Sequence, residues 1–443
     1  MVKTFAVGGI HPHDNKLSNK VEIYPVPIPK VVYVPLSQHL GAPAKAIVNK
    51  GDEVKVGTLI AESSSFISAN IHSPVSGKVS KVDKVLGSSG YLEDMIVINV
   101  EGDVWEDEID RSKDLISDIK MSSKDIISKI KEKGIVGMGG AGFPTHVKIS
   151  VPDGKKAEYL LINGVECEPY LTSDHRLMLE KSEEIMVGIK ILMKALNVDT
   201  AVIGIEANKP DAIAKLRDVS KKYDGIKIQP LKVKYPQGGE KQLIAAALKR
   251  EVPSKGLPID VGVIVQNVGT VFAVYEAVQK NKPLIERIVT VSGKCLKEPS
   301  NFLSRIGVPF GILIDMAGGV PENTAKLING GPMMGKTMVS DEIPVTKTCS
   351  GLLLISEKDA VRDEETPCIR CGRCSEACPA GLEPFMIASV SKIGDWERQR
   401  ENHVFDCIEC GSCTHVCPAK IPLLDYCRLA KAELRKIDAK KRS

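Results

Sequence analysis

Two cysteine runs near the C-terminal end constrain this chain more than any other feature of its sequence. The runs are Cys368, Cys371, Cys374 and Cys378, followed by Pro379, and Cys407, Cys410, Cys413 and Cys417, followed by Pro418. Each run has the spacing C-x2-C-x2-C-x3-C-P, which indicates iron–sulfur ligands because thiolates hold such clusters. Three closely spaced cysteines can face one cubane from a short turn, so this segment is expected to fold around its clusters.

The spacing resembles that of bacterial ferredoxins with two 4Fe–4S clusters. In that pattern the fourth cysteine of each run lies at the start of a helix and binds the other cluster. The predicted ligand sets are therefore crossed: Cys368, Cys371, Cys374 and Cys417 for one cluster, and Cys407, Cys410, Cys413 and Cys378 for the other. A chain with two such clusters carries single electrons.

A disulfide framework and zinc ribbons are the alternatives for eight cysteines. Disulfides belong to oxidising compartments and small chains, whereas this chain has 443 residues. Its first residues lead straight to Gly8 and Gly9 without the apolar core of a signal peptide. Zinc sites usually use paired C-x2-C motifs. Iron–sulfur binding is the favoured interpretation, and reduced thiols predict a cytoplasmic location.

Length and charge exclude some classes of protein. A single core is not expected at this length, and length alone predicts about three domains. The formal net charge of +4 is too weak to argue for nucleic acid. A basic tail from Arg428 to Arg442 is interpreted as a solvated terminus, with weak attraction to an anionic membrane surface as the alternative. No stretch reaches the about 20 apolar residues that span a bilayer, so a soluble or peripheral protein is expected.

Residues 31–100 have the pattern of an all-β unit. Short alternating strands are separated by glycines, and the two halves resemble the barrel-sandwich fold of lipoyl and biotinyl carriers. Those carriers expose a lysine at a hairpin tip, but the corresponding segment here, residues 63–69, contains none. We interpret this unit, with boundaries 1–104, as a structural domain and not a swinging arm.

Strands and helices alternate from Gly134 to about Lys282. The predicted strands are 159–162, 201–205 and 261–265, and the predicted helices are 183–196, 210–221, 240–249 and 270–279. Alternation of this kind predicts a layered α/β domain with a largely parallel sheet, here given the boundaries 105–284. Ligands are then expected at the carboxyl ends of the strands.

The predicted fold class is therefore multidomain α/β. The barrel-sandwich and layered α/β domains are followed by a small β-grasp-like (SLBB) module at 285–350 and a helical, ferredoxin-like two-cluster domain at 351–443. The cysteine runs of the last domain are separated by one predicted helical stretch, from Phe385 to Arg400.

A glycine-rich loop, Gly137–Pro144, precedes the first predicted strand of the α/β domain. Glycines let the backbone approach a flat or phosphorylated ligand and present amide donors. Alone, such a loop is weak evidence, since many are tight turns without a ligand. It lacks the Gly-Lys-[Ser/Thr] ending of a Walker loop, and no strand directly precedes it as in the dinucleotide fingerprint.

Four motifs in a fixed order are more specific than this loop alone. They are GMGGAGFPTHVK (137–148), NGVECEP (163–169), YPQGGEKQL (235–243) and QNVGT (266–270). Together they resemble the FMN- and NADH-binding subunit of respiratory complex I. With the β domain in front and the cysteine runs behind, the chain over nearly its full length resembles the RnfC family. That family contributes the NADH-binding subunit of Rnf membrane complexes, which transfer electrons between ferredoxin and NAD.

The resemblance implies two cofactor types, FMN and two 4Fe–4S clusters, with NAD(H) as substrate. The implied FMN-binding residues are Gly137, Gly139, Gly140, Lys148, Asn163, Glu166, Cys167, Gly238, Gly239, Asn267 and Thr270. Lys148 would meet the phosphate or ribityl chain, and Asn267 and Thr270 the phosphate at a helix N-terminus. For NADH, Phe143 would stack on the dinucleotide, and Glu168 and Glu240 would lie near the nicotinamide.

The sequence departs from the complex I pattern at three positions. Val165 stands where that pattern has an acidic residue, Cys167 where it has serine, and Gly239 where it has a second glutamate. Simpler interpretations remain open: Lys148 as a surface lysine, and Glu166 and Glu168 as a pair at a helix start.

The remaining cysteines and histidines have simpler interpretations. Cys167 is expected to be a neutral contact and not a nucleophile. Cys295, Cys349 and Cys427 belong to no ligand run and are expected to be buried thiols. His11 and His13 are expected in a solvated turn, and His415 beside a cluster without binding iron.

The resemblance implies an electron path from NAD(H) through FMN and both clusters to a partner subunit, with no catalytic nucleophile or acid–base pair. The chain would be the NADH-binding flavin iron–sulfur oxidoreductase subunit of an ion-translocating complex. It would lie peripherally at the cytoplasmic face of the membrane, against other Rnf subunits that include an iron–sulfur partner. The alternatives are a soluble flavin iron–sulfur reductase similar to cobalamin reductase, the flavin subunit of a bifurcating hydrogenase, and an electron-transfer module with a scaffold-only α/β part. Direction of flow and the pumped ion stay open.

Overall fold

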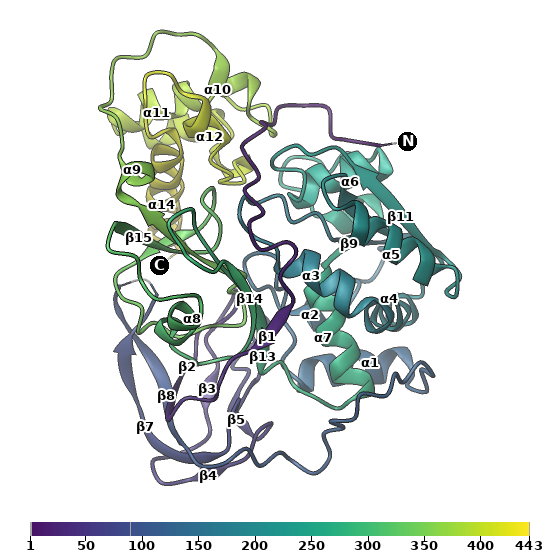
Figure 1. The fold of residues 1–443 in the computed structure, drawn as a ribbon. Helices are drawn as coiled ribbons and strands as arrows, with labels where there is room; N and C mark the ends of the chain where they lie inside the picture. Colours follow the sequence, from purple (N-terminus) through teal and green to yellow (C-terminus); the bar gives the residue numbers. More distant parts are fainter. Residues whose placement is uncertain (1, 89, 443) are drawn as a thin grey trace.

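The computed structural model describes residues 2–88 and 90–442. Figure 1 shows a β-rich part at the bottom, a layered α/β part on the right, a mixed sheet between them and a helical C-terminal part at the top left. This succession is the predicted fold class. Among the helices of the described residues, none combines the length and the apolar character needed to cross a membrane.

The β-rich part consists of two antiparallel sheets in the described residues. The larger has the order β2 (Val31–Pro35), β8 (Leu92–Val100), β7 (Gly77–Leu86) and β4 (Glu53–Val54), and the smaller has the order β3 (Lys45–Ala46), β5 (Leu59–Glu62) and β6 (Ile71–His72). Alternate residues face the core: Val32 pairs with Ile98 and Val34 with Ile96, and all four side chains are fully buried. Period-two alternation in the sequence therefore becomes one buried face.

The hairpin between β5 and β6 is docked against its neighbour. Ala69, at its end, is buried in the same apolar core as the α/β part. The Asn70 amide donates to the Glu132 carbonyl at 3.1 Å, and its own carbonyl accepts from Lys347 at 2.7 Å. These contacts fit a structural domain.

The α/β part contains a parallel sheet with helices on both faces. Its strand order is β11 (Ile226–Leu231), β10 (Ala201–Glu206), β9 (Tyr159–Asn163) and β12 (Val263–Asn267). The helical segments are α1 (Ser123–Glu132), α2 (Thr145–Ile149), α3 (Ser173–Glu180), α4 (Ser182–Leu196), α5 (Pro210–Ser220), α6 (Glu240–Leu248), η1 (Pro258–Val261) and α7 (Val268–Gln279). The predicted parallel sheet is confirmed, and all four strands end at the edge where the candidate site lies.

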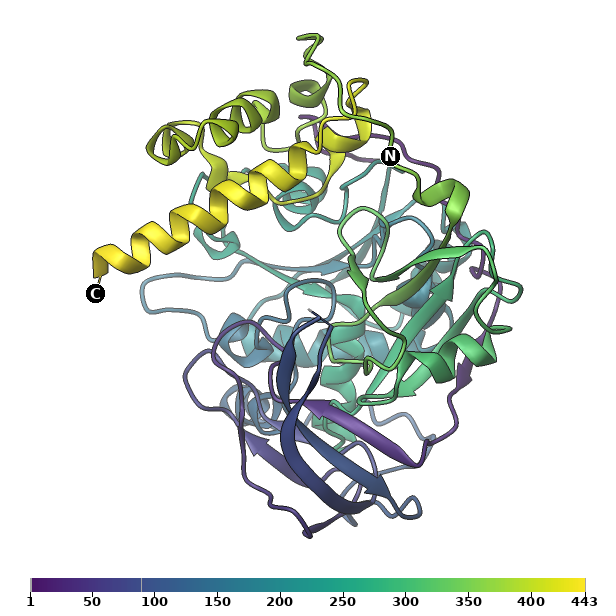
Figure 2. The same cartoon turned by 90° about the vertical axis from the view of Figure 1, so that its left-hand side faces the viewer.

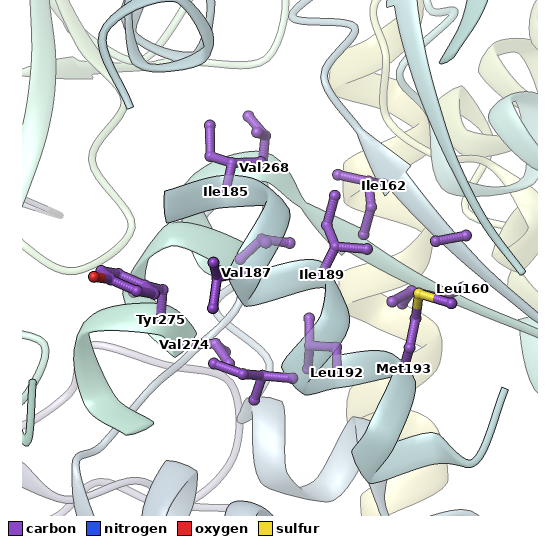
Figure 3. Close-up of a cluster of buried hydrophobic side chains, with 14 of the residues drawn as sticks. Leu160, Ile162, Ile185, Val187, Ile189, Leu192, Met193, Val268, Val274 and Tyr275 are labelled. Carbon is purple, nitrogen blue, oxygen red and sulfur yellow. The ribbon is translucent and has the colours of Figure 1, made fainter. Parts of the chain in front are cut away.

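The main core of this domain is formed by α4, α7 and the sheet. Figure 3 shows Ile185, Ile189 and Leu192 of α4 gathered with Val268 and Val274 of α7 and with Leu160 and Ile162 of β9. All seven side chains are completely buried. Burial of this many aliphatic side chains, at about 25 cal/mol per Å² of apolar surface, holds the helices on the sheet.

A six-stranded mixed sheet follows. Its order is β1 (Ile23–Pro25), β14 (Ser300–Arg305), β13 (Glu286–Ser292), β17 (Gly351–Ser356), β15 (Thr324–Asn329) and β16 (Lys336–Met338), and it is accompanied by α8 (Phe310–Met316). β17 pairs with both β13 and β15, so the sheet continues past residue 350. β1, from the N-terminal end of the chain, joins its edge.

The segment before β1 crosses the molecule as a strap, defined here as residues 3–25. Lys3 forms a bridge with Leu231, and Ile10 with Tyr235. The Gly9 amide donates to the Ala377 carbonyl at 3.0 Å. Figure 1 shows this segment, in purple, running between the helical C-terminal part and the α/β part before it reaches β1.

The C-terminal part is helical. Its elements are α9 (Glu357–Ala360), α10 (Arg373–Glu376), α11 (Pro384–Lys392), α12 (Trp396–Glu401), η2 (Val404–Asp406), α13 (Ser412–Val416) and α14 (Leu423–Arg442). The single helical stretch predicted from Phe385 to Arg400 is wrong in detail. It is interrupted at Gly394, whose φ of +71° ends α11, and Asp395 caps α12. Figure 2 shows α14, in yellow, extending away from the body at its C-terminal end.

Candidate functional site

The glycine-rich loop after α1 is held from behind and open in front. The Gly137 amide donates to the Phe143 carbonyl at 2.9 Å, which closes the loop. The Met138 amide donates to the Thr270 hydroxyl at 2.9 Å, and the Met138 carbonyl accepts from Arg287 at 3.1 Å. Gly139 and Gly140 are exposed at the tip.

The space around the two exposed glycines differs. A Cβ on Gly139 would lie 2.9 Å from the Asn267 side chain, whereas nothing lies within 4 Å of a Cβ on Gly140. Gly139 is thus required by close approach to α7, and Gly140 leaves open space over a bare backbone. A flat ring such as the isoalloxazine of FMN fits a loop of this kind, since no side chain projects from its tip.

Asn267 and Thr270 join this loop to the N-terminus of α7. The Asn267 Oδ1 accepts from the Gly269 and Thr270 amides at 2.8 and 3.4 Å, which caps the helix. Its Nδ2 donates to Asp174 at 2.7 Å. Both predicted phosphate-binding side chains therefore have partners within the protein, and they place the glycine loop at the helix end.

The loop after β9 and the turn after β11 are fastened to one another. The Asn163 Nδ2 donates to the Gly238 carbonyl at 2.8 Å, and the Gly238 amide donates to the Cys167 sulfur at 3.4 Å. Burial raises the pKa of Cys167 to about 12. The thiol therefore stays neutral. The structure brings Asn163, Cys167 and Gly238 together as one surface.

The two glutamates of this loop have different surroundings. Glu166 caps α3, where its carboxylate accepts from the Asp174 amide at 2.7 Å and the His175 amide at 3.2 Å. This is the helix-start arrangement weighed from the sequence. Glu168 instead accepts from the Met333 and Met334 amides at 3.1 and 2.8 Å, in the loop between β15 and β16. Burial raises the pKa of Glu168 to about 7.

Lys148 and Glu240 form an ion pair. The Lys148 nitrogen lies 2.6 Å from the Glu240 carboxylate, and both side chains are partly exposed. The pair joins α2, directly after the glycine loop, to the start of α6, directly after Gly239. Phe143 is half-buried in the same loop.

Five cysteines line one cavity in the C-terminal part. Cys378, Cys407, Cys410 and Cys413 are joined there by Cys427. We call the first four the inner cluster site. The Cys427 side chain is buried beside Cys407 in this cavity. The crossing of Cys378 to the second run is the arrangement expected from the two-cluster pattern.

The other four cysteines form what we call the outer cluster site. Cys368 and Cys371 are exposed, Cys374 is buried and Cys417 is intermediate. The Thr366 amide donates to the Ala419 carbonyl at 3.0 Å, so the chain before Cys368 lies beside the end of the second run. No group of His, Cys, Asp and Glu in the described residues is arranged to hold a single metal ion.

The inner cluster site lies directly against the glycine turn after β11. The Tyr235 hydroxyl donates to the Cys410 carbonyl at 2.8 Å, and Gln242 donates to the Pro379 carbonyl at 3.2 Å. Tyr235, Ala377 and Cys410 share a small apolar cluster against which Cys167 packs. The loop predicted to contact FMN and the inner cluster site are therefore neighbours.

Some contributors had no clear signal in the sequence. Tyr235 lies inside a quoted motif, but its hydrogen bond to Cys410 joins positions 175 residues apart. Arg287 is buried in β13, and a charged residue in an apolar strand could have indicated it. The His11 Nδ1 lies 2.9 Å from the Val233 carbonyl oxygen, and His13 and His415 are exposed.

Comparison with known proteins agrees with this arrangement. Four family models match successive segments: the RnfC barrel sandwich hybrid domain at 3–103, the Nuo51 FMN-binding domain at 130–276, the SLBB domain at 288–337 and the 4Fe-4S dicluster domain at 360–419. Fold and site together define a flavin and iron–sulfur electron-transfer protein, with FMN and two 4Fe–4S clusters as its cofactors.

Similar proteins identify the family to which this electron-transfer protein belongs. The chain is 47% identical over 442 residues to the C subunit of the proton-translocating ferredoxin:NAD(+) oxidoreductase complex of Clostridium ljungdahlii, covering 98% of this chain and 95% of that protein. It is 43% identical over 433 residues to the Na(+)-translocating counterpart of Acetobacterium woodii, covering 96% of each. The chain belongs to the RnfC family, the C subunits of ion-translocating ferredoxin:NAD(+) oxidoreductase complexes. Its partners are accordingly other members of such a complex.

Solved structures also include remote likenesses to this chain. The crystal structure of an NAD+-reducing [NiFe]-hydrogenase in the H2-reduced state contains a chain with 17% identity and a TM-score of 0.49, over 70% of this chain and 63% of that one.

Proposed function

We propose that the chain exchanges electron pairs with NAD(H) at its FMN-binding domain and passes single electrons through the inner and then the outer cluster site to another subunit. FMN, when bound, supplies the change from two-electron to one-electron transfer. The observation that carries this order is the junction of Tyr235 and Gln242 with the inner cluster site, at 2.8 and 3.2 Å.

The proposed FMN site uses the residues that the resemblance implied. Gly137, Gly139 and Gly140 would offer bare backbone to the ring, and Asn163, Cys167, Gly238 and Gly239 would form the opposite surface. Lys148 lies in α2, directly after the loop, and would bind the phosphate or ribityl chain, with its Glu240 contact exchanged for that ligand. Asn267 and Glu166 would act through the caps they make on α7 and α3, and Thr270 through its hydrogen bond from the Met138 amide.

NAD(H) binding is proposed at the open side of the glycine loop. Phe143 would stack on the dinucleotide, and Glu168 and Glu240 would lie near the nicotinamide. Support for Glu168 is limited to its position beside the Cys167 turn, since its carboxylate is held by the Met333 and Met334 amides.

The partner surface is proposed around the outer cluster site. Ile369, between the exposed Cys368 and Cys371, is 67% exposed, and Val361, seven residues before Cys368, is 73% exposed. A shallow depression next to them is lined by Pro367, Cys368, Phe385, Ile421 and Leu423, among others. Exposed apolar side chains beside an exposed cluster suit docking of an iron–sulfur partner subunit.

We also propose peripheral attachment at the cytoplasmic face of the membrane. The relatives are named as subunits of ion-translocating complexes, and the C-terminal half of α14 carries several lysines and arginines. Washing isolated native membranes with high salt would test this, since a peripheral subunit should then leave the membrane.

Anaerobic stopped-flow spectroscopy tests the NADH role. Flavin absorbance should bleach on mixing the reconstituted full chain with NADH, and bleaching should persist in a variant that lacks both clusters. Phe143→Ala should mainly raise the apparent KM for NADH, by roughly two- to tenfold, since ring stacking is worth about 0.5–1.5 kcal/mol. Flavin that NADH never reduces would reject the proposal.

A further inference from the structure

Lys16, in the N-terminal strap, binds the back of the loop predicted to contact FMN. Its ammonium donates to the carbonyls of Glu166, Glu168 and Leu171 at 2.8, 2.9 and 2.6 Å. An ammonium has three donors, so all of them are used on this loop. No other strap residue makes as many contacts to the loop in the described part of the chain.

A second lysine, itself buried, continues this arrangement. Lys209, before α5, donates to the Val165 carbonyl at 2.8 Å. Its charge is opposed by Glu206, 3.7 Å away. Lys16 differs, because its three partners are neutral carbonyl oxygens and no carboxylate of the described residues forms an ion pair with it.

The loop needs such support. Glu166 and Tyr170 have φ values of +47° and +69°, in the left-handed region that side chains other than glycine rarely adopt. The Lys16 contacts span both residues, from the carbonyl of Glu166 to that of Leu171. The strap therefore fixes a strained backbone whose other face carries Asn163 and Cys167.

The charge of Lys16 is also placed to act on a redox group. Burial, with the nearby charge of Lys209, lowers the pKa of Lys16 to about 8, so it stays mostly protonated at neutral pH. Reduced flavin bears more negative charge than oxidised flavin, and a nearby cation in a low-dielectric setting stabilises it. Glu166 and Glu206 oppose part of this charge, whereas Val165, where the complex I pattern has an acid, adds no further carboxylate.

We propose that Lys16 is a positioning residue that shapes the 163–171 loop from behind and raises the reduction potential of the bound flavin. The inference rests on the proposed FMN site. Lys16 does not touch the flavin, and it acts through the loop and through its charge.

The test uses the reconstituted full chain and three variants. Lys16→Met removes the donors and the charge, and Lys16→Gln keeps amide donors without the charge. Lys3→Met is the matched control, because Lys3 lies on the same strap and its ammonium donates to the Ala247 carbonyl at 2.7 Å, away from the loop. FMN affinity is read by fluorescence titration, and the flavin potential by anaerobic spectroelectrochemistry.

Lys16→Met should bind FMN about tenfold more weakly, as loss of hydrogen bonds worth about 1.4 kcal/mol would give. Both Lys16 variants should lower the flavin potential relative to wild type and Lys3→Met. If Lys16→Met does not fold, Lys16→Gln alone decides the charge effect. A flavin potential equal to that of wild type in Lys16→Gln would overturn the inference. A similar fall in FMN affinity and flavin potential in Lys3→Met would also overturn it. A wild-type chain that binds no FMN would instead reject the proposed function.

Discussion

The hydroxyl of Tyr235 donates a 2.8 Å hydrogen bond to the carbonyl oxygen of Cys410, one of the four cysteines of the inner cluster site. Tyr235 is 2% exposed and opens the glycine turn that Asn163 and Cys167 contact. One side chain thus connects the FMN-binding domain to a cysteine of the proposed inner cluster site.

Replacing Tyr235 by Phe should weaken the junction with Cys410 while the packing of the ring is kept. The ring stays, but the buried Cys410 carbonyl loses its donor, at a cost of about 1–3 kcal/mol. We expect a lower thermal midpoint and slower electron transfer from flavin to cluster in single-turnover experiments. Tyr24→Phe, at a half-exposed position of β1, is the control. Equal transfer rates in both variants would contradict a role for this hydrogen bond.

Gly139→Val should remove FMN and leave the fold. A branched side chain would overlap Asn267, 2.9 Å from the position of a Cβ, at a cost of about 1–3 kcal/mol. Asn267 cannot easily move because it caps α7. Flavin content after anaerobic reconstitution is the readout, with circular dichroism for the fold. Unchanged FMN content in Gly139→Val would show that the loop is misassigned.

The sequence predicted those parts of the fold whose signal is local. The strand runs at 159–162 and 201–205 are continuous and apolar, so the buried parallel strands β9 and β10 were predictable. β11 was missed because Lys227, Gln229 and Pro230 break its pattern at the edge of the sheet. The continuation of the six-stranded sheet through β17 depends on pairing with distant strands, which no local pattern encodes.

In the candidate site, too, the features with a local sequence signal were predictable and the contacts between distant residues were not. Cysteine spacing pointed to Cys378 joining Cys407, Cys410 and Cys413, because ligand geometry is encoded in spacing. The contacts of Lys16 and Arg287 were not predictable, since each joins residues more than 100 positions apart. Glu166 and Glu168 look equivalent in the motif, yet one caps α3 and the other binds the loop after β15.

Glu168→Gln should change how stability depends on pH. Burial raises the pKa of Glu168 to about 7, so the folded chain holds a proton that the unfolded chain releases above its ordinary value of 4.5. The stabilisation from this proton is present at low pH and is lost as pH rises through 7.

Glutamine does not titrate, so the free energy of unfolding of the variant should rise relative to that of wild type between pH 5 and pH 8. The gain should be about 1–2 kcal/mol, reduced by partial exposure of the carboxyl. The exposed Glu22→Gln serves as the control. A constant offset across this range would mean that Glu168 ionises normally in the folded chain.

Cys427→Ala should tune the inner cluster without removing it. Cys427 lines the same cavity as Cys407, where its thiol can donate to a ligand sulfur, and hydrogen bonds to ligand sulfurs raise a cluster's potential. The variant should keep about eight irons per chain, as two 4Fe–4S clusters require, while one cluster shifts to a lower potential in an EPR-monitored titration. Cys349→Ala, which removes another buried thiol far from the clusters, should change neither value. Loss of iron would instead identify Cys427 as a ligand.

Cys378→Ser and Cys417→Ser should separate the two ends of the electron path. Each removes one ligand, and iron should fall from about eight to about four per chain in both. Because Cys378 lines the cavity with Cys407, Cys410 and Cys413, its loss should empty the inner cluster site, which lies against Tyr235. NADH should then reduce the flavin, but the remaining outer cluster should stay oxidised in rapid-freeze EPR.

Cys417→Ser should behave differently, because the inner cluster keeps all four of its ligands. NADH should reduce the flavin and the inner cluster, and transfer to the partner subunit should stop. Cys349→Ser, outside both sites, should behave as wild type. If the two cluster variants exchanged these phenotypes, the ligand sets would not be crossed. If Cys378→Ser still reduced its remaining cluster at the wild-type rate, electrons would leave the flavin by a route that avoids the junction of Tyr235 and Cys410.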